Sequence, residues 1–190
     1  MKQPHRAPVR RALIIFLVAG VVVTSFRCSQ TEKAMQSFNN RPVSQFDLDR
    51  YLGTWYEIAR FPHRFEKDLA AVTATYEKRS DGKVKVINSG YKGEPGGPFR
   101  KATGKAKVVG TGHLKVSFFL FFYADYFVME LDPDYQWALV GSSSPGYLWI
   151  LSRSPEMEAP LYDSIVTMAS QRGYDPGQLI RVDHFQYTGS

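Results

Sequence analysis

The sequence of 190 residues offers few side chains of the types that perform catalysis. Its four histidines (His5, His63, His113 and His184) are far apart along the chain, and its one cysteine is Cys28. No Gly-x-Ser-x-Gly segment presents a serine nucleophile. No glycine-rich loop suits a phosphate, and no spacing of ligands suits a metal ion. We therefore predict a binding protein with no catalytic residue, no metal and no cofactor.

Cys28 is the residue with the most direct chemical use, because it closely follows an apolar run. A cysteine in this place resembles the lipidated first residue of bacterial lipoproteins. Ser25-Phe26-Arg27 precedes it, whereas that pattern has a branched aliphatic residue three positions before the cysteine and a small residue directly before it. Lipidation of Cys28 is one hypothesis. Cleavage after Ser25, which would release a soluble protein with a free thiol, is the other.

Residues 1–27 are predicted to be a signal peptide. They hold five Lys and Arg and no Asp or Glu. The apolar run Ala12–Thr24 would span only ~20 Å as a helix, against a hydrocarbon core of ~30 Å. An uncleaved anchor and twin-arginine export through Arg10-Arg11 are the alternatives. Without this segment the net charge of +6 falls to +1, so nucleic acid is not a predicted partner. Residues 28–45 are polar and are predicted to form a tether.

From Thr54 onward, short alternating runs separated by turn residues predict antiparallel strands. The expected strands are Thr54–Phe61, Ala71–Lys78, Lys83–Gly90, Arg100–Val109, His113–Phe118, 125–132, 135–142 and 147–152. One helical turn is expected over Asp47–Leu52. A helix is expected from Ser154-Pro155-Glu156 to Arg172-Gly173, followed by an extended piece at Leu179–Val182. The apolar face of the helix consists of Leu161, Ile165, Met168 and Ala169.

Eight short antiparallel strands leave exposed sheet edges unless the sheet closes on itself. The composition, 44% hydrophobic and 22% charged, is that of a globular protein. We therefore predict an all-β fold: an eight-stranded antiparallel up-and-down barrel with one C-terminal α-helix packed outside. The interior of such a barrel can hold one small ligand.

Three segments of the chain carry a family resemblance: Gly53-Thr54-Trp55, Asp132-Pro133-Asp134-Tyr135 and Leu151-Ser152-Arg153. In order and spacing they resemble the three signatures of the lipocalins. The wider strings GTWYEIARF, KVSFF and YLWILSR are similar to the bacterial outer-membrane branch, with the apolipoprotein D group more distant. The resemblance covers about residues 45–185 and implies a barrel domain over residues 46–190. It implies structural roles for Gly53, Trp55, Asp132, Tyr135 and Arg153, with Arg153 stacked on Trp55.

The resemblance also implies a register in which Trp55 points into the barrel. The ligand-binding side chains implied by this register are Val72, Ala74, Tyr76, Val86, Asn88, Val116, Phe118, Phe127, Met129, Ala138, Tyr147 and Trp149, with Ala106 and Val140 beside them. Small residues at inward positions, Gly104 among them, leave space for a cavity. A mostly apolar lining suits a lipid tail. Glu57 shares the inward face and is expected to be a hydrogen-bonded partner rather than a general acid.

The aromatic run Phe118–Tyr123 lies between the fifth and sixth expected strands, at the open end of a lipocalin barrel. It would form an apolar lip that meets an acyl chain, a membrane surface or a second protomer, unless half of it turns inward as core. Arg60, Arg64, Lys67 and Arg100 are expected near the same mouth, where cations would meet a carboxylate or phosphate head group.

Together these patterns predict a protein that binds and stores or transports fatty acids or lysophospholipids at the bacterial cell envelope. We expect attachment to the outer membrane through a lipid on Cys28, with a soluble periplasmic protein as the less favoured alternative. A lipid-modifying enzyme and a carrier of a pigment such as haem or a bilin are the other functions considered. A homodimer through the aromatic lip stays open.

Overall fold

The computed structural model describes residues 38–93 and 97–184. The chain divides into two units, residues 1–34 and 35–190, and every described residue belongs to the second. The predicted signal peptide and Cys28 lie outside the described residues. Within the described part of the chain, the helices are too short or too polar to traverse a bilayer.

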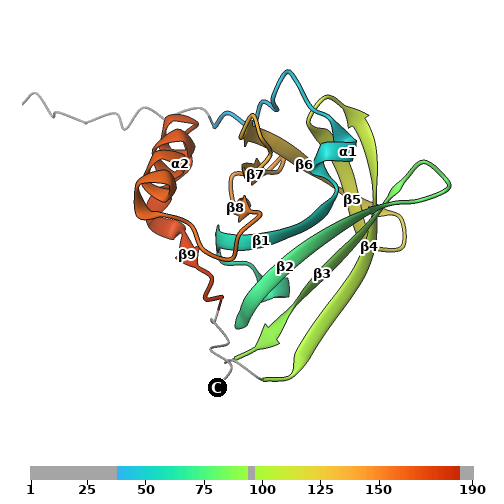
Figure 1. The fold of residues 1–190 in the computed structure, drawn as a ribbon, viewed down its shortest axis with the longest axis horizontal. Helices are drawn as coiled ribbons and strands as arrows, with labels where there is room; N and C mark the ends of the chain where they lie inside the picture. The colour runs from blue at the N-terminus through green and yellow to red at the C-terminus, as the bar shows by residue number, and fades with distance from the viewer. Residues whose placement is uncertain (1–37, 94–96, 185–190) are drawn as a thin grey trace, which may run out of the picture. The chain divides into compact units, whose positions relative to one another are not determined.

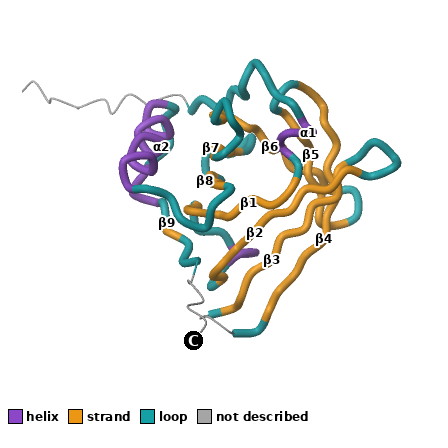
Figure 2. The backbone as a smooth tube through the Cα atoms, viewed as in Figure 1, coloured by secondary structure: helices purple, strands orange, loops and turns teal. Residues whose placement is uncertain are grey.

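Eight strands follow one another in chain order around a closed barrel (Figure 1). Each strand pairs antiparallel with the next, β8 pairs with β1, and β1 pairs with β2. The connections are mostly short (Figure 2). The strands are β1 Gly53–Arg60, β2 Leu69–Lys78, β3 Val84–Lys92, β4 Phe99–Gly110, β5 His113–Phe119, β6 Phe122–Leu131, β7 Trp137–Gly141 and β8 Leu148–Ser152. The predicted barrel is confirmed.

The strand ends differ from the predicted ranges at several turns. β2 begins at Leu69, two residues before the expected start, and β6 begins at Phe122 rather than residue 125. β7 begins only at Trp137, because Tyr135 adopts φ 60° in the turn before it and leaves the extended conformation. A short 3₁₀ segment, η1 Arg64–Glu66, lies in the β1–β2 connection.

Strand β1 bends between two sets of partners. Its first half pairs with β2, with Trp55 opposite Ala74, and its last residues pair with the short strand β9 Ile180–Arg181. The pairing with β8 shifts register between Glu57 and Ala59. A bulge at this point turns two successive residues, Ile58 and Ala59, to the outside of the barrel, where both are buried. The next residue, Arg60, therefore points inward again.

Helix α2, Ala159–Gln171, packs outside the barrel beside β1, β7 and β8 (Figure 1). Ile165 and Ala169 are fully buried against an outer core that includes Leu139 and Ile150, as the predicted apolar face requires. The expected start at Ser154 is wrong. The Ser154 hydroxyl accepts only the N–H of Glu156, a local turn, and the helix begins five residues later with a proline in its first turn. A second 3₁₀ segment, η2 Pro176–Gln178, follows it.

The closed end of the barrel contains Trp55 and Arg153, two of the signature residues predicted to be structural. Helix α1, Leu48–Tyr51, is capped by the Asp47 carboxylate, and Trp55 below it is fully buried. The guanidinium of Arg153 lies 3.9 Å from the centre of the Trp55 ring. It also donates hydrogen bonds to backbone carbonyls around α1, including those of Arg50 and Leu52. Arg153 therefore ties the end of β8 to the helix that covers the barrel.

The remaining signature residues shape the β6–β7 turn at the same end. The Asp132 carboxylate accepts the N–H groups of Asp134 and Gln136. The Tyr135 hydroxyl accepts the N–H of Asp47, at 2.7 Å. Gly53 adopts φ 97°, and a Cβ there would lie 3.3 Å from the Arg153 guanidinium. These contacts hold the turn against the start of the barrel.

Residues 38–45, expected to belong to the tether, lie against the barrel unit. The Asn39 N–H bonds to the Arg172 carbonyl, and the Val43 N–H bonds to the Val128 carbonyl. Phe38 packs edge-on to Tyr174 with ring centres 5.2 Å apart. The predicted tether 28–45 is therefore too long at its C-terminal end, and residues 28–37 lie outside the described residues.

Candidate ligand-binding cavity

A cavity of about 560 Å³ lies inside the barrel. The volume falls within the range of ~300–1,000 Å³ that is common for small-molecule sites. Its lining is mostly apolar and comes from seven of the eight barrel strands, all but β7, and from the η1 segment. The lining residues are Glu57, Phe65, Glu66, Leu69, Val72, Ala74, Tyr76, Val86, Asn88, Ser89, Arg100, Lys101, Ala102, Val116, Phe118, Phe119, Phe122, Ala124, Asp125, Tyr126, Trp149 and Leu151.

Most of the side chains that the sequence places inside the barrel line this cavity. They are Val72, Ala74, Tyr76, Val86, Asn88, Val116, Phe118 and Trp149. Ala106 and Val140 are fully buried in the inner core beside Trp55, toward the closed end. Ala138 belongs to the same core and does not reach the cavity. Tyr147 is also outside the lining, because it precedes β8 and stacks on Trp149 from the rim.

The expected inward positions of Phe127 and Met129 are wrong. Met129 is fully buried in the outer core beneath α2, where the Tyr174 hydroxyl lies 3.4 Å from its sulfur. Phe127 packs against the same outer core. The interior positions of β6 belong instead to Ala124 and Tyr126, which line the cavity, and to Val128. The predicted register of this strand is therefore off by one residue.

Gly104 creates space that another side chain occupies. A Cβ at this position would lie 2.6 Å from the Ser117 carbonyl oxygen and 2.8 Å from the Phe118 ring. Any larger residue would therefore displace the ring of Phe118, which lines the cavity. The small residue accommodates an aromatic ring at this level, so the space predicted from Gly104 does not remain open.

The deep end of the cavity contains a hydrogen-bonded group of tyrosines. The Tyr126 hydroxyl lies 2.6 Å from the Tyr51 hydroxyl and accepts a hydrogen bond from the Tyr76 hydroxyl at 2.9 Å. Burial raises the pKa of Tyr126 well above its usual range, and the two neighbouring phenols raise it further. The three hydroxyls therefore stay neutral and satisfy one another, which leaves mainly ring surface for a ligand.

A charged cluster occupies the interior beside β1. The bulge after Glu57 places both Glu57 and Arg60 inside, where each is about 95% buried or more. The Arg60 guanidinium donates to the Glu57 carboxylate at 2.6 Å and to the Glu66 carbonyl at 2.8 Å, and its Nε lies 3.9 Å from the Glu66 carboxylate. Burial raises the pKa of Glu57, Glu66 raises it further, and Arg60 lowers it. One arginine thus faces two carboxyl groups, and the pKa of Glu57 lies above its ordinary value.

The cluster extends to the mouth through His63 and Trp149. Nε2 of His63 lies 3.0 Å from the Glu66 carboxylate, although neither ring nitrogen makes a well-directed hydrogen bond within the described residues. The Trp149 indole N–H points to the same carboxylate at 3.4 Å. Phe65 stacks on His63 with ring centres 3.9 Å apart. Sequence reasoning placed Glu57 inside but missed Glu66 and His63, whose positions depend on the η1 loop.

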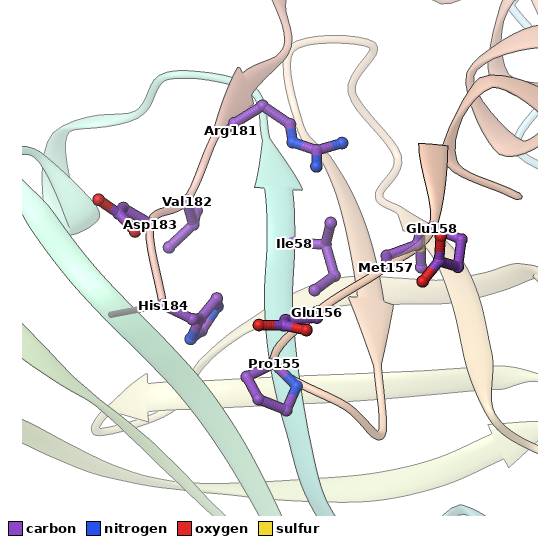
Figure 3. Close-up of a pocket in the computed structure, with 9 residues that line it drawn as sticks. All are labelled: Ile58, Pro155, Glu156, Met157, Glu158, Arg181, Val182, Asp183 and His184. Carbon is purple, nitrogen blue, oxygen red and sulfur yellow. The ribbon is translucent and has the colours of Figure 1, made fainter. Parts of the chain in front are cut away.

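A second hollow lies on the outside of the barrel (Figure 3). It is formed by the segment 155–158 before α2 and by the C-terminal segment 181–184, over Ile58. Its volume is about 330 Å³, and charges of both signs surround it: Glu156, Glu158, Arg181 and Asp183. Such a lining does not suit a lipid tail. Among the described residues, no group of three or more His, Cys, Asp or Glu could hold a metal ion.

An antiparallel barrel that is closed at one end by a tryptophan–arginine pair, and that encloses an apolar cavity, defines a class of small-ligand binding proteins. The chain belongs to the lipocalin family, because residues 46–184 match the Lipocalin-like domain. The resemblance read from the sequence is confirmed.

Several known proteins are similar to this chain. The outer membrane lipoprotein Blc of Vibrio cholerae is 47% identical over 146 residues, which cover 75% of this chain and 85% of that protein. Apolipoprotein D of Cavia porcellus is 33% identical and covers 75% of this chain and 78% of its own length. The structure of insecticyanin from Manduca sexta superposes with a TM-score of 0.63 at 24% identity, covering 77% of this chain and 85% of that one, which shows the fold alone.

Proposed function

We propose that the protein binds a single-chain amphipathic lipid, a fatty acid or a lysophospholipid, with the acyl tail in the cavity. The observation that carries the proposal is the enclosed apolar space of about 560 Å³ between the tyrosine floor and the aromatic mouth. Each methylene that leaves water for such a space contributes about 0.8 kcal/mol. A tail therefore supplies the affinity, and the head group selects among lipids.

The charges of the site favour entry with the tail first. Two carboxyl groups, those of Glu57 and Glu66, line the cavity against the single guanidinium of Arg60, and the Oδ1 of Asn88 has no partner among the described residues. An anionic head group would be repelled from this interior. Arg100 and Lys101 line the cavity near its mouth and suit a carboxylate or a phosphate there.

We further propose that the protein stores or transports these lipids at the outer membrane, held there by a lipid on Cys28. The support is the 47% identity to a protein named an outer membrane lipoprotein, together with the basic and apolar leader before Cys28. Metabolic labelling with a fatty acid should mark the wild type and leave Cys28→Ser unlabelled. An unlabelled wild type would overturn the proposed lipid anchor on Cys28, and the proposal that the cavity binds a lipid would still stand.

Tryptophan fluorescence offers a direct test of lipid binding, because Trp149 is the one tryptophan among the three of the chain that lines the cavity. Trp55 is buried at the closed end, and Trp137 packs on the outer core. Delipidated protein is titrated with a fatty acid, a lysophospholipid and a diacyl phospholipid. We expect saturable quenching with the two single-chain lipids and its loss in Trp149→Phe.

A matched pair of variants separates cavity binding from adsorption. Ala74→Phe places a ring in the cavity and should abolish saturable binding, whereas Thr103→Phe adds the same ring on the outer face of β4 and should leave binding unchanged. Equal binding by both variants, or no response of the wild type to any lipid, would overturn the proposal. Turnover of a lipid that is lost in Glu57→Gln would indicate an enzyme instead.

A further inference from the structure

The open end of the barrel exposes an unusual amount of apolar surface. We call Phe65, Phe99, Phe119, Leu120, Phe121 and Phe122 the aromatic rim. Their exposed fractions run from 56% at Phe99 to 85% at Phe121. Because the strands are antiparallel, the β1–β2, β3–β4 and β5–β6 connections that carry these residues all lie at the same end. A patch of this kind marks an interaction site.

The tip of the β5–β6 hairpin is not explained by the cavity. Leu120 and Phe121 form the turn and are absent from the lining, although Phe119 and Phe122 on either side belong to it. Leu120 adopts φ 47°, a conformation that favours glycine over any residue with a Cβ. The hairpin therefore keeps a large apolar side chain at a position where glycine would turn more easily, and strain of this kind collects at functional sites.

Unpaired cations surround the same hairpin. Lys105 lies 5.9 Å from the Phe121 ring, and Lys107 lies 4.9 Å from the Tyr123 ring, both on the outer face of β4. Arg100 and Lys101 stand at the cavity mouth. Within residues 38–93 and 97–184, none of these four cations has a carboxylate within 4.0 Å. The nearby Asp125 is already held by Lys115 and His113, at 2.9 and 2.8 Å.

We propose that the aromatic rim, with Lys105 and Lys107, is a docking surface for an anionic phospholipid bilayer. Aromatic side chains that project among lysines suit the boundary between head groups and acyl chains. Cations at this boundary are attracted by the negative potential of anionic lipids. A second copy of the chain fits less well, because pairing two rims would bring their positive charges together. Docking in this way turns the cavity mouth toward the membrane.

Vesicle flotation tests the surface directly. The protein used starts at residue 28 and carries Cys28→Ser, so that neither the leader nor a lipid anchor binds the vesicles. The described barrel closes on itself and contains both hydrophobic cores, so it folds without residues 1–27. We expect partition onto vesicles of phosphatidylcholine with about one third phosphatidylglycerol, much weaker partition onto phosphatidylcholine alone, and a decline with added salt.

Two variants and two matched controls define the surface. Leu120→Gly/Phe121→Ser should lower partition about tenfold or more, because glycine accepts the turn while the apolar tip is lost. Lys105→Gln/Lys107→Gln should lower partition to a similar extent on the anionic vesicles only. Two control variants make the same kinds of substitution at the opposite end of the barrel and should have no effect: Val108→Ser/Val109→Ser at the end of β4, and Lys78→Gln/Lys83→Gln on either side of the β2–β3 turn.

Three outcomes would overturn the proposal. They are no partition of the starting protein, partition that ignores the charge of the vesicle, and equal losses in the control variants. A dimer in solution that Phe121→Ser dissociates, without vesicle binding, would assign the rim to a second copy. Neither hairpin residue changed here lines the cavity, so the lipid titration should be unaffected. Failure of docking and failure of the proposed lipid binding are thus distinguishable.

Discussion

Replacement of Arg60 by methionine tests whether one guanidinium balances the charges inside the barrel. The side chains of Arg60 and Glu57 are 4% and 5% exposed, and that of Glu66 is 6% exposed. Solvent therefore screens these charges only weakly when the arginine is lost. Methionine keeps much of the volume of the alkyl chain, so the main change is electrostatic. It also removes the donors to the carbonyls of Glu66 and Leu69.

The expected loss follows from the burial of both partners. Removing one member of a buried ion pair generally costs about 3–5 kcal/mol, because the other charge stays behind uncompensated. We expect Arg60→Met to lower the free energy of unfolding by about that amount near neutral pH. Adding Glu57→Gln to the same chain removes one of the two stranded carboxylates and should recover about 1–3 kcal/mol. Lys78→Met, which breaks an exposed pair with Asp49, is the control and should have little effect.

The pH dependence gives an independent reading of the same cluster. The pKa of Glu57 is raised in the folded protein above its ordinary value of 4.5. A raised carboxyl pKa stabilises the fold fully below that ordinary value, and the contribution is lost as the pH rises through the folded pKa. Glu57→Gln has no carboxyl group to titrate at this position, so its stability does not fall in this way as the pH rises. Its stability relative to the wild type should therefore increase as the pH is raised from 4.5.

Urea unfolding, followed by far-ultraviolet circular dichroism at about pH 5 and about pH 8, measures both effects. The penalty of Arg60→Met should be smaller at the lower pH, where the carboxyl groups take up protons. The reasoning is refuted if the penalty is the same at both values, or if the double variant is no more stable than Arg60→Met alone. Either result would mean that Arg60 acts through packing rather than charge.

Three further substitutions have expected outcomes in thermal or urea unfolding. Gly104→Ala should lower the free energy of unfolding by about 1–3 kcal/mol, because its Cβ would meet the Ser117 carbonyl at 2.6 Å; an unchanged midpoint would show that β4 yields at this level. Trp55→Ala should lower the free energy of unfolding by about 3–5 kcal/mol, since it empties the closed end and leaves Arg153 without its ring. We expect this loss to exceed that of Arg153→Ala, and a smaller loss in Trp55→Ala would contradict the prediction. Tyr126→Phe should cost about 1–3 kcal/mol, because the hydroxyls of Tyr51 and Tyr76 lose their shared partner, and equal stability would show that water replaces it.

The order of strands and the closed end could be predicted from the sequence because both depend on local patterns. Turn residues separate runs of period two, and the signature residues Gly53, Trp55 and Arg153 mark the closure. The helix start could not be located in the same way. Ser154-Pro155-Glu156 has the composition of a helix start, and only the fold shows that it forms a turn that carries the chain from β8 to α2.

The register of β6 shows where period-two reasoning fails. The strand has apolar residues on both faces, since Tyr126 and Val128 belong to the inner core while Phe127 and Met129 belong to the outer core. Alternation of apolar and polar residues marks a face only when one side of the sheet is wet. On strands covered by the helix that condition is absent, so the sequence alone gives two equivalent registers. The lining predicted from β2, β3 and β5, which contribute no residue to the outer core, agrees with the cavity.

The bulge in β1 accounts for the part of the site that sequence reasoning missed. Strict alternation from Trp55 would place Ala59 inside and Arg60 outside, yet the register shift after Glu57 reverses both. Arg60 then bonds backbone carbonyls of η1 and of β2, and so holds the β1–β2 connection over the mouth. One local irregularity thereby places Glu66, His63 and Phe65 around the entrance. The interior charges and Phe65 of the aromatic rim thus depend on the same strand, so a change at Arg60 should alter both the stability of the barrel and the shape of its opening.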